Sequence, residues 1–195
     1  LHGAGGAHEH GVVVTLQDLA PLHRAEDALR LLSYSDSVTG LPNRRRLAEQ
    51  VSQALADPAG KAGAGVVAFR VHNFDRVVQA RGHDYGNKLI VQLAGRIEAE
   101  LERIGQGGSI QWRTDQPSVC RTADGELSVL LRSRVSTEHV ATVTHAVLEA
   151  VSSPLPQAEV DYVPAISAGI ALLEGDGADA DQLVANAHAA AELGT

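Results

Sequence analysis

Histidine and cysteine are the residue types best suited to transition-metal binding or nucleophilic chemistry, and the chain has nine histidines and one cysteine. Three histidines, His2, His8 and His10, lie in a Gly/Ala-rich N-terminal stretch. Such a stretch is typical of a mobile loop or terminus and not of a fixed metal site. The single cysteine, Cys120, lies in an apolar-leaning stretch. We predict that Cys120 fills a core position and is not a catalytic thiol.

A second place where chemistry is possible combines His72 with Glu126. His72 directly follows the apolar run at residues 64–71, and Glu126 opens the apolar run at residues 126–132. Imidazole and carboxylate groups are both ligands of transition metals. One of each is too few to define a site, so the residue types alone do not predict a metal centre.

These side chains must be positioned by strands, which apolar β-branched runs predict, and by helices, which apolar residues spaced three or four apart predict. The expected elements are a helix ending near residues 57–58, a strand at 64–71, helices at 72–81 and 86–104, strands at 109–113 and 126–132, a helix at 137–151, a strand at 162–173 and a helix at 179–193. The strands at 109–113 and 126–132 are expected to form a hairpin. The order βααββαβ plus a C-terminal helix predicts an α/β sandwich, with a central, mainly antiparallel sheet flanked by helices.

The first 35 residues differ from the remainder. Residues 11–19 predict a strand, and Asp18 followed by Pro21 predicts the start of a helix. Apolar residues recur along this helix at Leu22, Ala25, Leu29 and Leu32. The spacing fits the seam of a short parallel coiled coil, and it fits equally well a single amphipathic helix lying on its own domain. The turn-rich segment at residues 36–43 predicts that a new domain begins there.

Charge and hydropathy exclude several classes of function. The 195 residues carry a formal net charge of -8, so the chain has no basic surface of the kind that nucleic acid requires. No apolar run approaches the roughly 18 residues of a membrane span, and residues 1–10 lack the features of a signal peptide. A lone cysteine suits a reducing compartment. We therefore expect a cytoplasmic protein that binds no nucleic acid and has no membrane span in this fragment.

Several motifs resemble those of one known family. Residues 36–45 read DSVTGLPNRR and resemble the D-x-L-T-G-L-x-N-R-R signature that opens GGDEF domains. Phe74 and residues 82–86 resemble the family's F-K…G-H-x-x-G core, residues 167–171 its S-I-G-I-A strand, and residues 186–190 its N-A-D-x-A helix. The resemblance covers residues 36–195, and it implies the nucleotidyl cyclase-like fold of this family.

The resemblance also implies a chemistry and shows where this chain departs from it. Active GGDEF domains condense two GTP molecules into cyclic di-GMP across a dimer, with Mg²⁺ or Mn²⁺ neutralising charge between the phosphates. The family's strand-end metal acid corresponds to Arg70, and the third, catalytic residue of its signature corresponds to Gly125. Glu126 is retained, whereas Asp124 is displaced by one position. The resemblance therefore implies no intact catalytic set, and we expect Mg²⁺ to act only if residual activity remains.

Nucleotide recognition departs from the family pattern as well. The family's base-reading asparagine and aspartate correspond to Val78 and Asn87, and its product-feedback motif R-x-x-D corresponds to residues 114–117, which read TDQP. A valine cannot hydrogen-bond, whereas an asparagine keeps a donor and an acceptor. The residues that could still contact a nucleotide are Arg70, Phe74, Asn87 and Glu126.

The surrounding segments resemble parts of larger signalling proteins. Residues 1–20 are similar to the end of a PAS sensor domain, residues 21–35 to a signalling helix, and residues 36–195 to a degenerate GGDEF domain. Residues 172–183 resemble GGDEF domains that precede an EAL phosphodiesterase domain. The expected partners are these neighbouring domains, a protein partner, or a second copy held weakly through Leu22, Leu29 and Leu32.

These departures predict a catalytically inactive regulatory module in bacterial cyclic di-GMP signalling. Two alternatives stay open. One is a GTP-binding allosteric domain that controls a linked EAL phosphodiesterase, and the other is a residual diguanylate cyclase.

Overall fold

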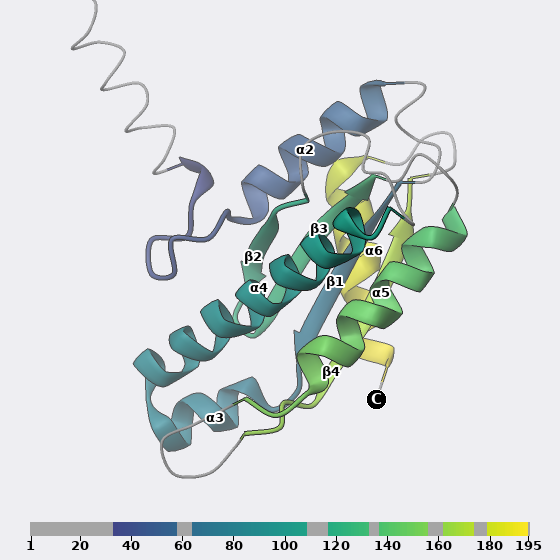
Figure 1. The fold of residues 1–195 in the computed structure, drawn as a ribbon. Coiled ribbons are helices and arrows are strands. Elements are labelled where there is room, and N and C mark those ends of the chain that lie inside the picture. Colours follow the sequence, from purple (N-terminus) through teal and green to yellow (C-terminus); the bar gives the residue numbers. More distant parts are fainter. Residues whose placement is uncertain are drawn as a thin grey trace, which may run out of the picture.

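The architecture is seen in a computed structural model, which describes residues 33–57, 64–108, 117–132, 137–155, 162–173 and 179–194. Figure 1 shows a sheet with helices on both of its faces. The described helices are α2 (Arg44–Ala56), α3 (Phe74–Arg81), α4 (His83–Gln106), α5 (Thr137–Ser152) and α6 (Ala180–Leu193), and the strands are β1 (Ala64–Val71), β2 (Val119–Ala123), β3 (Glu126–Arg132) and β4 (Ile166–Leu172).

The sheet has the strand order β2-β3-β1-β4, and each neighbouring pair is antiparallel. The central strand β1 pairs with β3 so that Val67 lies opposite Val129 and Arg70 lies opposite Glu126. The predicted α/β sandwich around a mainly antiparallel sheet is therefore confirmed.

The side chains of each strand point alternately to the two faces of the sheet, so the core has two layers. Val67 and Phe69 of β1 face α4 and α5, whereas Val66 and Ala68 belong to the layer under α2 and α6. Successive side chains of a strand point to opposite faces of the sheet. Arg70 therefore points to the side of α6, and so do the even-numbered residues of β3.

Helix α6 lies unusually close to β4. A Cβ atom added at Gly169 would lie 2.2 Å from the backbone oxygen of Ala187 and 2.2 Å from the backbone nitrogen of Ala191. The Ser167 hydroxyl donates a hydrogen bond to the Ala191 carbonyl at 2.5 Å. Gly169 thus sets the distance at which the side chains of α6 meet the sheet.

The expected hairpin needs a correction. The partner of β3 is Val119–Ala123, and the chain reverses at Asp124 and Gly125. Gly125 has φ of +71°, a left-handed conformation that glycine adopts without strain, and Asp-Gly is a strong turn sequence. The strand expected at residues 109–113 lies outside the described residues.

Other element boundaries also shift. Helix α4 begins at His83 and not at Gly86, because Gly82 (φ +87°) ends α3 and admits the next helix directly. Strand β4 begins only at Ile166. Cys120 is fully buried, and burial raises the pKa of its thiol to about 12, so its predicted core role is confirmed. The segments assigned to a PAS remnant and to a helix with Leu22, Leu29 and Leu32 lie outside the described residues.

No helix among the described segments is long and apolar enough to cross a membrane.

Candidate functional site

The side chain of Glu126 is enclosed by one cation from the sheet and one imidazole from α6. Arg70 lies opposite Glu126 in the β1–β3 register, and its Nη1 donates a hydrogen bond to Glu126 Oε1. His188 of α6 approaches from above, with its Nδ1 2.5 Å from Glu126 Oε2. Only 12% of the Glu126 side chain is exposed. Both carboxylate oxygens therefore have a partner within the protein.

The hydrogen-bond chain continues beyond the imidazole. His188 Nε2 lies 3.2 Å from the Ser128 hydroxyl, which in turn lies 3.0 Å from the Thr122 hydroxyl. A proton on Nδ1 makes His188 a donor to Glu126 and leaves Nε2 free to accept from Ser128. Each polar group of this chain under α6 thereby has a partner, which is what buried polar groups require.

The order serine, histidine, carboxylate is also that of a nucleophilic triad. The burial of the serine hydroxyl excludes that chemistry here. Ser128 has 0% of its surface exposed, and it lies in the middle of β3 beneath α6. Since no substrate can reach its hydroxyl, this chain of hydrogen bonds is structural.

The arrangement does not fit a divalent cation as it stands. Arg70 places a permanent positive charge on Glu126, and its Nη2 lies 3.8 Å from Glu192 Oε1. Mg²⁺ needs several oxygen ligands in octahedral geometry. Among the described residues no group of three or more His, Cys, Asp or Glu side chains could hold a metal ion. A phosphate group would likewise have to compete with Glu126 for the guanidinium of Arg70.

The hydrogen bond from His188 lowers the pKa of Glu126, and the charge of Arg70 adds to this effect, whereas burial alone would raise the pKa. A carboxyl group whose pKa falls on folding stabilises the folded state above its ordinary pKa of 4.5, and this contribution is lost as the pH falls through the lowered value.

We therefore expect the difference in unfolding free energy between the wild type and Glu126→Gln to be largest at neutral pH and to shrink below pH 4.5. Urea unfolding at a series of pH values measures it, and at neutral pH the difference should be about 1–3 kcal/mol. Glu98→Gln is a matched control, because it makes the same change at an exposed position of α4. A Glu126→Gln difference that stays constant with pH would contradict the ionised pairing.

The tip of the β2–β3 hairpin rests directly on the first residue of α3. A Cβ atom at Gly125 would lie 2.7 Å from Phe74 Cβ and 2.8 Å from Phe74 Cγ. At the far end of the Phe74 ring, a Cβ atom at Gly86 would lie 3.1 Å from Phe74 Cζ and 2.7 Å from Val78 Cγ2. Phe74 is only 7% exposed. It is thus a core residue, packed between the hairpin and the two helices α3 and α4.

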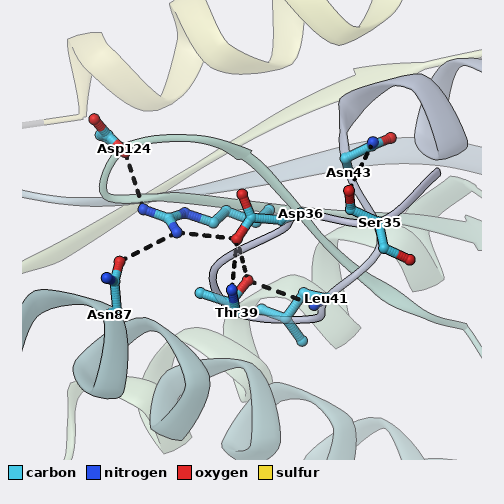
Figure 2. A network of polar contacts seen from close by, with 8 residues as sticks. Ser35, Asp36, Thr39, Leu41, Asn43, Asn87 and Asp124 are labelled. Atoms are coloured by element: carbon cyan, nitrogen blue, oxygen red, sulfur yellow. Dashed lines mark hydrogen bonds and ion pairs between the residues drawn. The ribbon is translucent and has the colours of Figure 1, made fainter. Parts of the chain in front are cut away.

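Asn87 belongs to a separate polar network, which Figure 2 shows together with Asp36, Thr39 and Asp124. The guanidinium of Arg121 lies at the centre of this network. Arg121 donates to Asp36 Oδ1 at 3.1 Å, to Asn87 Oδ1 at 3.2 Å and to Asp124 Oδ1 at 2.9 Å. Asp36 Oδ1 also accepts from the backbone nitrogen of Thr39 at 2.8 Å and from its hydroxyl at 2.5 Å. The signature segment that begins at Asp36 is therefore tied to the hairpin through one nearly buried arginine.

Burial alone would raise the pKa of Asp36, but the hydrogen bonds from Thr39, together with the charge and the hydrogen bond of Arg121, lower it. Beside this network lies a polar cavity of about 740 Å³, lined among others by Arg44, Arg45, His83 and Asn87. Its size is within the range of ligand pockets.

The residues singled out from the sequence thus fall into three places. Arg70 and Glu126 lie together, Gly125 lies against Phe74, and Asn87 lies in the network of Arg121. The sequence reasoning missed His188 as the second partner of Glu126. A signal for it existed, because Arg70 and His188 both carry basic side chains where the motifs resembling D-I-D-x-F-K and N-A-D-x-A have an aspartate.

The antiparallel sheet between helices, with this hairpin beside its central strand, defines a domain of the nucleotidyl cyclase class. Residues 33–193 match the family described as "Diguanylate cyclase, GGDEF domain". The chain therefore belongs to the GGDEF family.

Individual relatives agree with this assignment. The chain is 27% identical over 190 residues to the cyclic di-GMP phosphodiesterase PdeR of Escherichia coli, covering 97% of this chain and 27% of PdeR. It is 29% identical over 170 residues to the bifunctional diguanylate cyclase/cyclic di-GMP phosphodiesterase MucR of Pseudomonas aeruginosa, covering 87% of this chain and 23% of MucR. It thus spans about a quarter of the length of these curated relatives.

Among solved structures, the FimX GGDEF domain from Pseudomonas aeruginosa superposes with a TM-score of 0.67 at 18% identity, over 83% of this chain and 93% of that one. At this identity the likeness concerns the fold alone.

Proposed function

We propose that this GGDEF domain is a non-catalytic regulatory module of a larger, cytoplasmic cyclic di-GMP signalling protein. One observation carries the proposal: Glu126, which aligns with the retained acid of the signature, has both carboxylate oxygens engaged by Arg70 and His188. By the resemblance to the family, this intramolecular cation replaces an acid that would bind a divalent metal in an active member.

The chemistry of phosphoryl transfer indicates how far the loss of a metal reduces the rate of turnover. Bound divalent metals supply several kcal/mol of charge stabilisation in the transition state. Each 1.36 kcal/mol corresponds to about a factor of ten in rate. The guanidinium of Arg70 neutralises Glu126 but cannot coordinate the attacking oxygen. The loss of one metal therefore suffices to reduce turnover by about a thousandfold.

The regulatory part of the proposal is supported by the relatives. PdeR is named as a phosphodiesterase and MucR as a bifunctional protein, and each is about four times as long as the matched region. We infer that the partners of this domain are the neighbouring PAS and EAL domains of one polypeptide, with Leu22, Leu29 and Leu32 in the connecting helix. No metal cofactor is required for such a role.

The direct test is incubation of the purified chain with GTP and Mg²⁺ or Mn²⁺, followed by chromatography of the nucleotides. We expect cyclic di-GMP at least about a thousandfold below that made by an active diguanylate cyclase at equal concentration. The proposal would be overturned if the chain made cyclic di-GMP at the rate of an active diguanylate cyclase and the Glu126→Gln variant did not. That variant controls for a contaminating cyclase, whose product would persist.

A second candidate function is nucleotide binding without turnover. It is favoured by the polar cavity beside Asn87, which has the arginines Arg44 and Arg45 in its lining. Calorimetric titration with GTP tests it, with Asn87→Leu as the variant. Saturable binding that Asn87→Leu weakens, without product, would identify a GTP sensor.

A further inference from the structure

A second hollow lies on a different face of α3 from the one that contacts the hairpin. Phe74 and Val78 face Gly125 and Gly86, whereas Arg76, Val77 and Ala80 line this other cavity. Its volume is about 510 Å³. We call it the α3 groove; its further lining includes Arg81, Tyr85, Tyr162 and Val163.

The walls of the α3 groove are held by backbone hydrogen bonds. Tyr162 and Leu155 exchange two such bonds, at 2.8 and 3.0 Å, and Leu155 is buried in the core. The backbone nitrogen of His72 donates to the Ala165 carbonyl at 2.8 Å. The groove is therefore formed without a ligand, as is usual for small-molecule sites.

The lining combines aromatic and aliphatic surfaces. Burial raises the pKa of the Tyr162 phenol, and the nearby Tyr85 phenol adds to the effect. Val163 leaves 60% of its surface exposed, which makes it one of the few large apolar side chains in contact with solvent in the described part of the chain. A flat ring would find apolar contact on these side chains, with phenol groups at its edge.

Among the described residues that line the groove, the charged side chains have one sign. They are Arg76 and Arg81, and the described lining contains no acidic side chain. Most other arginines of the described segments have a hydrogen-bonded acidic partner, namely Arg46, Arg70, Arg103, Arg121 and Arg132. The guanidinium of Arg81 instead lies over the Tyr85 ring, 5.5 Å from its centroid. In a chain of net charge -8, Arg76 and Arg81, for which the described segments show no acidic partner, form a local positive site.

We propose that the α3 groove binds a small aromatic monophosphate, with the ring against Tyr85, Tyr162 and Val163 and the phosphate on Arg76 and Arg81. Guanidinium groups suit this ligand because their planar fork matches two phosphate oxygens. The groove shares no lining residue with the pair of Arg70 and Glu126, so this inference is independent of the proposed function.

The test is calorimetric titration of the whole chain with phenyl phosphate, AMP and GMP, beside guanosine and inorganic phosphate. We expect at least one aromatic monophosphate to bind at least about tenfold more tightly than guanosine or phosphate alone, because only it meets both the ring wall and the arginines. Arg76→Ala should weaken that binding about tenfold. Arg103→Ala is the matched control, since Arg103 is exposed on α4, where it forms an ion pair with Glu100. The Arg103→Ala variant should bind the aromatic monophosphate as tightly as the wild type.

A second variant keeps the result interpretable. Val163→Glu places a negative charge at an exposed position of the lining, so it should weaken binding without unfolding the domain, as circular dichroism would verify. The proposal is overturned if none of the three aromatic monophosphates binds. It is also overturned if binding survives Arg76→Ala and Val163→Glu but is lost in Asn87→Leu, because the ligand would then occupy the cavity beside Arg121.

Discussion

Replacing Gly169 by alanine should lower the free energy of unfolding by about 3 kcal/mol or more, the largest effect we expect from adding a single methyl group. The added Cβ would lie 2.2 Å from two backbone atoms of α6, and backbone cannot rotate away as a long side chain can. Helix α6 would have to move off the sheet by more than an ångström. For a domain of this size, the midpoint of thermal unfolding should fall by about 6–12 °C.

The chain offers a matched control for this substitution. Gly95 lies on the exposed side of α4, and nothing lies within 4 Å of a Cβ atom added there. Gly95→Ala should therefore raise the stability by about 0.5–1 kcal/mol, because alanine favours the helix. Equal effects of the two substitutions would show that α6 is not held at the distance described. In Gly169→Ala we also expect the pH dependence assigned to Glu126 to be reduced, since His188 would retreat from it.

The fold could be predicted from the sequence because its elements are long and strongly periodic. The helix with apolar residues at Leu89, Leu93 and Ile97 and the strand at residues 64–71 are examples, and both are confirmed. The predicted hairpin partner at residues 109–113 is wrong, because β2 has only five residues and follows a stretch with its own strand-like composition. The Asp124-Gly125 pair predicts the observed hairpin better, since an Asp-Gly pair between apolar runs specifies a tight reversal of the chain.

The candidate site could be predicted only in part. The motif alignment identified Arg70, Gly125 and Glu126 one by one. It did not predict that Arg70 and Glu126 pair, because this depends on the β1–β3 register, which a shift of one residue would reverse. The contact of His188 with Glu126 further depends on how closely α6 approaches the sheet. The sequence indicates this distance only through small residues such as Gly169, whose effect depends on the packing around it.

Restoring both missing acids, in the double variant Arg70→Asp/Gly125→Asp, should still yield no more than trace cyclic di-GMP. An aspartate at position 125 would place its Cβ 2.7 Å from Phe74 Cβ, on a backbone with φ of +71° that disfavours side chains. Either the hairpin or Phe74 must move, so the restored carboxylate would not adopt the required position. If positions 78 and 87 correspond to the family's base-reading residues, as the resemblance implies, Val78 and Asn87 would also present the wrong groups to guanine. The measurement is the rate of product formation with GTP and Mg²⁺, compared with an active diguanylate cyclase. If the double variant instead turns over GTP at the rate of an active cyclase, the packing of Gly125 against Phe74 does not prevent catalysis.

The single variant Arg70→Asp tests whether Arg70 alone prevents a divalent metal from binding to Glu126. It puts two carboxylates opposite each other in the register of β1 and β3, so without metal we expect a loss of about 2 kcal/mol in unfolding free energy. Mg²⁺ or Mn²⁺ should restore part of this loss by binding between the carboxylates, since a ligand of the folded state stabilises it. Arg70→Ala is the control: it removes the cation without adding a carboxylate, and its thermal midpoint should not depend on the metal. If the thermal midpoint of Arg70→Asp does not depend on the metal either, Arg70 is not the residue that keeps a divalent ion away from Glu126.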